Sequence, residues 1–189
     1  MLNRIRPLVS QVFAVAARGF SRLRFTPNAV TLLGFAVTAL GALLILLGRY
    51  PYAVILVALG GFMDGVDGAL ARQLNRVTKF GGALDSVLDR YGDALIIVAS
   101  WYSLGVMPVL GFFALVGSLI TSYSRARLEV TGLSLSGVGI LERPERMIIL
   151  VLTLIFSAYA NYFFIVLAVL SNFTVVQRVV YGWRRLGDS

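Results

Sequence analysis

The sequence predicts an all-α integral membrane protein with six transmembrane helices and an amphipathic N-terminal helix on the membrane surface. Composition is the first reason: 58% of the 189 residues are hydrophobic and only 14% are charged, whereas about 25% are charged in typical soluble domains. The mean hydropathy of +0.85 agrees with this. The second reason is that short turns divide the chain into apolar stretches of about 20 residues, the length that crosses a bilayer. We expect one domain over residues 1–189.

Residues 1–20 form the expected surface helix. Apolar residues such as Phe13 and Phe20 recur there at helical spacing, with three arginines among them. Such a pattern is typical of a helix that lies in the membrane interface. A signal peptide is the alternative, but the apolar stretch is broken and no small-residue cleavage site follows it. Thr26 and Pro27 then begin the first span as its N-cap and first helical residue.

The apolar segments predict a six-helix bundle over residues 28–183. Its spans cover residues 28–48, 52–73, 80–104, 108–131, 142–160 and 162–183. The turns at 48–51, 105–108 and 157–161 would then lie together on one side of the membrane. Of the 17 basic residues, Arg49 alone would lie with these turns. The positive-inside rule therefore places the opposite side, with both termini, in the cytoplasm of a multi-pass cell-membrane protein.

Composition also limits the partners and the chemistry. The formal net charge of +8 would suggest nucleic acid in a soluble protein. Here the basic residues lie between apolar spans, so we expect the membrane, anionic lipid and anionic substrates as partners, and no nucleic acid. The absence of Cys excludes disulfides and thiol catalysis. The absence of His excludes the commonest general base, so a carboxylate would have to abstract any proton.

Four of the nine acidic residues lie between positions 64 and 89, in the second and third spans. Asp64 and Asp67 are three residues apart. Asp85 and Asp89 are four apart, so each pair projects from one face of its helix. The polar segment 73–80 is typical of a turn between antiparallel helices, so the two pairs would face each other at one level. Carboxylates converging within a membrane need cations, and all-oxygen ligands favour Mg²⁺ or Mn²⁺, of which two would balance four charges.

Small and basic residues beside these acids suit a bound phosphate. Gly68 and Gly81 remove side chains where a phosphate or nucleotide would approach the backbone. Arg72, about one turn beyond Asp67, would clamp that phosphate with two hydrogen bonds. The simpler interpretation is that the acids form structural ion pairs with nearby arginines. Four acids in register make that interpretation the weaker one.

A second basic group lies on the same side, at the ends of later spans. Arg125 precedes the end of one span, Arg143 and Arg146 start the next, and Arg178 lies near the cytoplasmic end of the last. Snorkelling arginines that fix the topology are the simple interpretation. For Arg125, Arg146 and Arg178, which can converge beside the aspartates, we expect an anion-binding pocket. The two glutamates within 142–146 would orient these arginines rather than bind metal.

The aspartate pattern D-x2-D-G-x2-A-R-x8-G-x3-D-x3-D resembles that of the CDP-alcohol phosphotransferase family. The segments Ser-Tyr-x-x-Ala-Arg at 122–127 and Glu-Arg-Pro-Glu-Arg at 142–146 are similar to those of phosphatidylinositol-phosphate synthases and their archaeal archaetidylinositol-phosphate counterparts. The likeness extends from Thr26 to Arg178. It implies a homodimer of six-span subunits, each with a cytoplasm-facing cavity that opens sideways to lipid.

The resemblance also implies roles for single residues. The metal ligands would be Asp64, Asp67, Asp85 and Asp89, of which Asp89 would also accept the proton in catalysis. The CDP-lipid would be held by Asn28, Thr31, Gly68, Arg72 and Thr78. The phosphate of the acceptor would be held by Ser122, Arg125, Arg146 and Arg178. Relatives often have Lys where Arg125 stands, which keeps the charge and alters the geometry. Asp93 would lie deeper and outside the ligand set, either protonated or paired with Arg90.

The predicted activity is transfer of a phosphatidyl-type group, with acyl or ether chains, from a CDP-lipid to a hydroxyl of inositol phosphate, releasing CMP. The predicted cofactor is Mg²⁺ or Mn²⁺. Glycerol phosphate is the alternative acceptor because it offers the same phosphate. A divalent cation transporter is the alternative of another class, but transport favours acids spread through the membrane depth and helices broken near its midplane. A non-catalytic lipid-binding scaffold would not need four aspartates.

Overall fold

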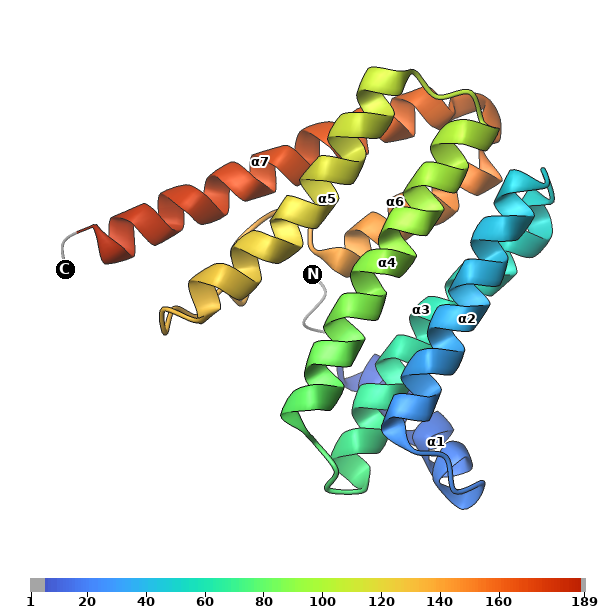
Figure 1. Cartoon of the computed structure of the whole chain (residues 1–189), viewed down its shortest axis with the longest axis vertical. Helices are drawn as coiled ribbons and strands as arrows, with labels where there is room; N and C mark the ends of the chain where they lie inside the picture. Colours follow the sequence, from blue (N-terminus) through green and yellow to red (C-terminus); the bar gives the residue numbers. More distant parts are fainter. Residues whose placement is uncertain (1–5, 188–189) are drawn as a thin grey trace.

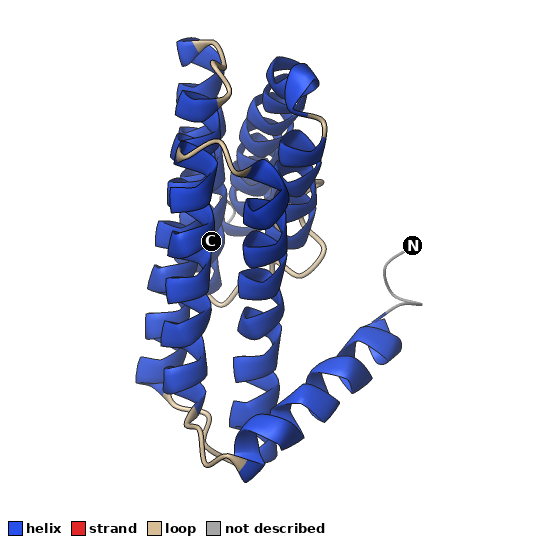
Figure 2. Cartoon of the chain, turned by 90° about the vertical axis from the view of Figure 1, so that its right-hand side faces the viewer, coloured by secondary structure: helices blue, strands red, loops and turns tan. Residues whose placement is uncertain are grey.

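The computed structural model describes residues 6–187. Seven α-helices and one short 3₁₀-helix make up this part of the chain, which contains no strand (Figures 1 and 2). The helices are α1 (Arg6–Arg22), α2 (Pro27–Leu46), α3 (Tyr50–Gln73), α4 (Lys79–Ser103), α5 (Pro108–Glu129), α6 (Arg143–Ile155), η2 (Ser157–Tyr159) and α7 (Ala160–Leu186). The all-α prediction is confirmed for these residues. Positions 1–5 of the expected surface helix lie outside them.

Four helical segments are long and apolar enough to cross a membrane. They are Pro27–Leu46, Tyr50–Gln73, Pro108–Glu129 and Ser157–Leu186. The charged helix α4 and the 13-residue helix α6 do not meet that criterion. At 1.5 Å per residue α6 is about 20 Å long, shorter than a hydrocarbon core of about 30 Å. The structure supports a membrane protein, while the count of six spans stays a prediction.

Close contacts at glycines hold α2, α3 and α4 together. Thr38 of α2 lies against both other helices: a Cβ on Gly60 would come within 2.1 Å of its Oγ1, and one on Gly92 within 3.2 Å of its Cγ2. Small residues allow such approach between helices in membrane proteins. Because Gly60 is one turn from Asp64 and Gly92 precedes Asp93, this contact fixes the relative height of the acidic residues on α3 and α4.

The second half of the molecule consists of α5, α6 and α7, with α5 and α7 running beside each other (Figure 1). The main apolar core joins the two halves and includes the fully buried residues Ile45, Val57, Leu150 and Phe164. Helix α6 contacts α3, α4 and α7. The start of α6 is therefore held against the two helices that carry the aspartates.

Helix α1 leaves the foot of the bundle at an angle (Figure 2) and packs on α3. Ala17 and Phe13 meet Val66 in a second, smaller apolar cluster. A Cβ on Gly65 would lie 2.4 Å from the ring of Phe13, so glycine is needed for this close packing. The opposite face of α1 exposes apolar side chains such as Val15. This distribution fits the predicted helix that rests on lipid.

Candidate functional site

Three aspartates from two helices come together near the foot of the bundle. Asp64 of α3 and Asp85 and Asp89 of α4 each place one carboxylate oxygen within 4.8 Å of the others. The turn between Gln73 and Lys79 reverses the chain as expected, so these three acids face each other. Asp67 lies outside this group of three and lines the neighbouring cavity together with Asp85.

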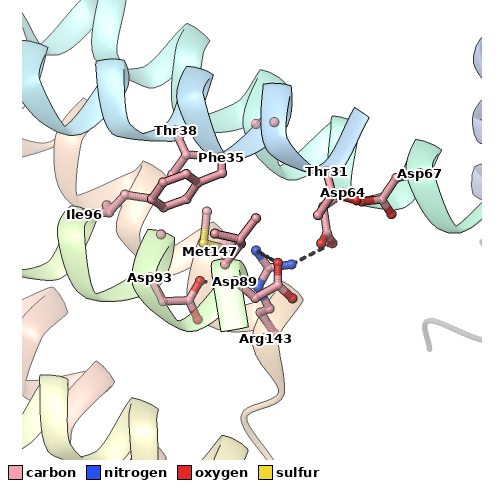
Figure 3. A pocket seen from close by; sticks show the side chains of 14 residues that line it. Thr31, Phe35, Thr38, Asp64, Asp67, Asp89, Asp93, Ile96, Arg143 and Met147 are labelled. Carbon is pink, nitrogen blue, oxygen red and sulfur yellow. Dashed lines mark hydrogen bonds and ion pairs between the residues drawn. The ribbon is translucent and has the colours of Figure 1, made fainter. Parts of the chain in front are cut away.

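Arg143 of α6 lies among these acids (Figure 3). Its Nη1 is 2.6 Å from Asp64 Oδ2, its Nη2 is 2.9 Å from Asp89 Oδ1, and its Nε is 3.3 Å from Asp93 Oδ1. Arg143 was not among the site residues predicted from the sequence. The available signal was its helical i, i+3 spacing from Arg146, which puts both guanidinium groups on one face. The alternative interpretation, in which the acids form ion pairs with nearby arginines, therefore holds for Asp64 and Asp89.

The acids also keep oxygens that have no partner. Asp67 Oδ2 and Asp85 Oδ1 are buried and accept no hydrogen bond. A buried polar atom without a partner is destabilising, and carboxylate oxygens are the hard donors that Mg²⁺ and Mn²⁺ prefer. Both orphaned oxygens belong to the predicted ligand set. The residues of this site therefore fit a divalent metal ion.

A cavity of about 270 Å³ adjoins the acids at the turn between α3 and α4. The residues predicted to hold a CDP-lipid all line it: Asn28, Thr31, Gly68, Arg72 and Thr78. Thr78 caps α4 by accepting a hydrogen bond of 3.0 Å from the N–H of Gly81. A Cβ on Gly81 would lie 2.9 Å from Thr78 Oγ1 and 3.1 Å from Asn28 Oδ1. Glycine at this position keeps that wall of the cavity open.

A second polar cavity, of about 360 Å³, is formed by α4, α5, α6 and the last helix. The residues predicted to hold the acceptor phosphate all line it: Ser122, Arg125, Arg146 and Arg178. Arg146 and Arg178 are only 2% exposed. The Arg125 side chain is 42% exposed and pairs with Glu129 at 2.9 Å. Asp89 and Asp93 line the same cavity, so the arginines lie next to the acid cluster.

Arg178 also has a structural role that the sequence did not indicate. Its Nε donates to the carbonyl of Val138 at 3.0 Å, and its Nη1 donates to the carbonyl of Thr121 at 2.6 Å. Its Nη2 is 4.0 Å from Glu142 Oε1.

Glu145 contacts the backbone rather than an arginine. Its carboxylate accepts a hydrogen bond of 3.1 Å from the backbone N–H of Glu142 and so caps α6. The expectation that Glu145 orients the arginines is therefore wrong.

The environment of Asp93 differs from the expected one. Arg90 donates to the backbone carbonyl of Ser86 on its own helix. Asp93 is paired instead with Arg143 and, at 3.1 Å, with Arg146. The expected pairing with Arg90 is wrong because α6 brings two arginines to the buried face of α4. The helical spacing of residues within α4 cannot predict that α6 packs against this face.

A larger, apolar cavity of about 700 Å³ opens beside the acids between α1, α3 and α6. Phe13, Val57, Met147 and Leu152 contribute to its wall. Gly61 also lines it and has no atom within 4 Å of a Cβ built on it. The apolar wall continues to Asp64, Asp89 and Arg143. An apolar chain in this cavity would thus end at the charged site.

Known proteins share both sequence and fold with this chain. The archaetidylinositol phosphate synthase of Pyrococcus horikoshii is 40% identical over 186 residues, which cover 98% of each chain. The phosphatidylinositol phosphate synthase of Mycobacterium tuberculosis with CDP-DAG bound matches with a TM-score of 0.81 and 32% identity, covering 92% of this chain and 94% of that one.

The same enzyme in complex with manganese and citrate matches with a TM-score of 0.81 and 33% identity, covering 90% of this chain and 88% of that one. A family model described as CDP-alcohol phosphatidyltransferase matches residues 24–176. This chain therefore belongs to the CDP-alcohol phosphatidyltransferase family.

Proposed function

We propose that this enzyme transfers the phosphatidyl-type group of a CDP-lipid to a hydroxyl of inositol phosphate and releases CMP. The arrangement of the site carries the proposal: the acid cluster lies between a cavity suited to the donor and a cavity lined by several arginines, of which Arg146 and Arg178 are buried. Asp85 lines the first and Asp89 the second. The acceptor hydroxyl would form a bond to the lipid-side phosphorus while the bond from that phosphorus to CMP breaks.

The donor would occupy two of the cavities. Arg72 and Thr78 line the polar one, where the diphosphate and nucleotide would lie, and the apolar cavity of about 700 Å³ suits a lipid chain. The CDP-DAG bound to the M. tuberculosis relative supports this assignment. Acyl and ether donors carry the same head group, so the polar cavity does not distinguish them.

The metal would be Mg²⁺ or Mn²⁺, held as two ions by Asp64, Asp67, Asp85 and Asp89. Bound there, it would neutralise the diphosphate and stabilise the CMP leaving group. The manganese in the complex of the M. tuberculosis relative supports a divalent ion. Arg143 contacts one oxygen of Asp64 and one of Asp89, which leaves the second oxygen of each for other partners. Asp89 would also take the proton of the acceptor hydroxyl, because the chain has no His.

The acceptor phosphate would bind in the cavity of about 360 Å³. Arg146 keeps its Nε buried and without a hydrogen-bond partner, so a donor is available for an anion. Ser122 and Arg125 line the same wall. Glycerol phosphate offers the same phosphate, and the name of the P. horikoshii relative, an archaetidylinositol phosphate synthase, favours inositol phosphate.

In the membrane, the chain would form one domain over residues 1–189 with six spans and α1 on the surface. The active site and both termini would face the cytoplasm, since the basic residues lie mainly at that side of the bundle. We infer a homodimer from the family resemblance. The partners would be CDP-lipid, inositol phosphate and membrane lipid, without nucleic acid.

A panel of acceptors tests the proposal. Purified protein would be given one CDP-lipid, Mg²⁺ and radiolabelled inositol phosphate, inositol, glycerol phosphate or serine, and CMP release would be measured. We expect turnover with inositol phosphate and none in excess chelator. Turnover in chelator would contradict the metal site. No CMP release with any acceptor, together with divalent cation flux into liposomes, would favour the transporter instead.

A further inference from the structure

We propose that Asp93 is a positioning residue for the acceptor: it holds Arg146 and Arg143 in the orientation that lets an anionic acceptor bind beside the acid cluster. The proposal rests on the function proposed above. It concerns a carboxylate that lies outside the predicted metal-ligand, donor and acceptor sets.

Asp93 uses its two oxygens for two different arginines. The residue is 4% exposed on α4 and lines the acceptor cavity. Its Oδ1 accepts from Arg143 Nε at 3.3 Å, and its Oδ2 accepts from Arg146 Nη2 at 3.1 Å. One buried carboxylate therefore fixes two guanidinium groups from adjacent turns of α6. Figure 3 shows the side chains of both Asp93 and Asp89 close to Arg143.

Arg146 depends on Asp93 more than Arg143 does. Within residues 6–187, Asp93 is the acidic partner of Arg146, whose Nη2 also lies 3.3 Å from Ser122 Oγ. Arg143 has two further acidic partners, Asp64 and Asp89. Removing one member of a buried ion pair leaves the other charge uncompensated. Loss of the Asp93 charge should therefore displace Arg146 first and disturb the acceptor cavity more than the acid cluster.

Arg143 gives Asp93 a connection to the reacting centre. The contacts run from Ser122 through Arg146 to Asp93, and from there through Arg143 to Asp64 and Asp89. This chain of contacts joins the acceptor cavity to the proposed metal ligands and proton acceptor. Asp93 lies at its centre, so it would set the distance between the bound acceptor and the acids.

The Asp93→Asn variant tests this inference because it keeps the shape and removes the charge. We expect the acceptor KM to rise about ten- to a hundredfold, with the KM for CDP-lipid within about twofold of wild type. Asp93→Glu should recover part of the loss. Ser100→Ala is the matched control, since Ser100 is buried on the same helix and its Oγ has no hydrogen-bond partner. An unchanged acceptor KM in Asp93→Asn would overturn the inference.

A double variant keeps the test decisive if Asp93→Asn does not fold. Asp93→Asn with Arg146→Gln removes both members of the pair and leaves no unpaired charge between them. Arg143 keeps Asp64 and Asp89 as partners when the Asp93 charge is removed, so Asp93 should act on the acceptor mainly through Arg146. The acceptor KM of the double variant should then equal that of Arg146→Gln alone. A value several-fold higher would overturn the inference. Wild-type enzyme that does not use inositol phosphate would instead contradict the proposed function, so the two failures are distinguishable.

Discussion

Arg143 and Asp93 show how the buried charges of this molecule are balanced. Each contacts at least two oppositely charged side chains from other helices. Charged groups within a membrane protein are stable only when they are paired or face water. The four acids of the predicted ligand set differ in their partners. Asp64 and Asp89 both pair with Arg143. Asp67 and Asp85 each have a buried oxygen without a hydrogen-bond partner.

Asp89 is the residue whose substitution separates catalysis from binding. Asp89→Asn should lower turnover by about 10²-fold or more if proton abstraction is lost. Binding of CDP-lipid, measured by displacement of a labelled analogue, should change much less. A proportional loss of binding and turnover would mean that Asp89 acts chiefly as a ligand and that the base is elsewhere.

Arg178 should behave differently from the other arginines of the cavity. Arg178→Ala removes two hydrogen bonds to the carbonyls of Val138 and Thr121. Hydrogen bonds to charged groups contribute about 1.5–3 kcal/mol each, so the free energy of unfolding should fall together with acceptor affinity. Thermal unfolding in detergent checks this. The matched variant Arg125→Ala, at an exposed arginine, should leave the unfolding temperature nearly unchanged, and equal losses in the two variants would contradict the assigned structural role.

The packing of α1 against α3 depends on the glycine at position 65. A side chain at Gly65 would meet the ring of Phe13, so Gly65→Ala should push α1 away from α3 and lower thermal stability. Gly61→Ala is the control, because nothing lies within 4 Å of a Cβ there. Adding Phe13→Ala to Gly65→Ala should recover part of the loss. A Gly65→Ala protein as stable as wild type would show that α1 does not pack as described.

The elements themselves were largely predictable from sequence. Turns at Gly48 and Gly105 lie where expected, and both glycines have the positive φ that favours glycine. Helix α6 differs most: it ends at Ile155, and a 3₁₀ turn follows over Ser157–Tyr159, within the expected span 142–160. Apolar composition continues through this break, so hydropathy alone did not reveal it.

The pairing of helices was less predictable than their positions. The spacing of the aspartates indicated that α3 and α4 face each other, because both belong to one hairpin. Arg143, in contrast, reaches Asp64 from 79 positions away in the chain. Helical periodicity says which residues share a face and does not say which helix that face meets. The contacts of Asp93 were missed for the same reason.

At the scale of the whole molecule, the site lies where two differently built halves meet. The half with α2, α3 and α4 supplies the acids and the cavity proposed for the donor. The half with α5, α6 and α7 supplies Arg125, Arg146 and Arg178. The aspartate motif, the basic segments at 122–127 and 142–146 and the family resemblance together predicted this division of roles, which stays a prediction. The apolar cavity beside α1 was not predicted in detail, because it depends on how α1 and α6 are placed against α3.

A competition between acceptors tests the central claim most directly. Equal concentrations of inositol phosphate and glycerol phosphate would be supplied with one CDP-lipid and Mg²⁺, and the lipid products would be quantified by mass spectrometry. The proposed function predicts that the inositol phosphate lipid dominates, with one CMP released for each lipid formed. A product that is mainly the glycerol phosphate lipid would contradict the assignment of the acceptor.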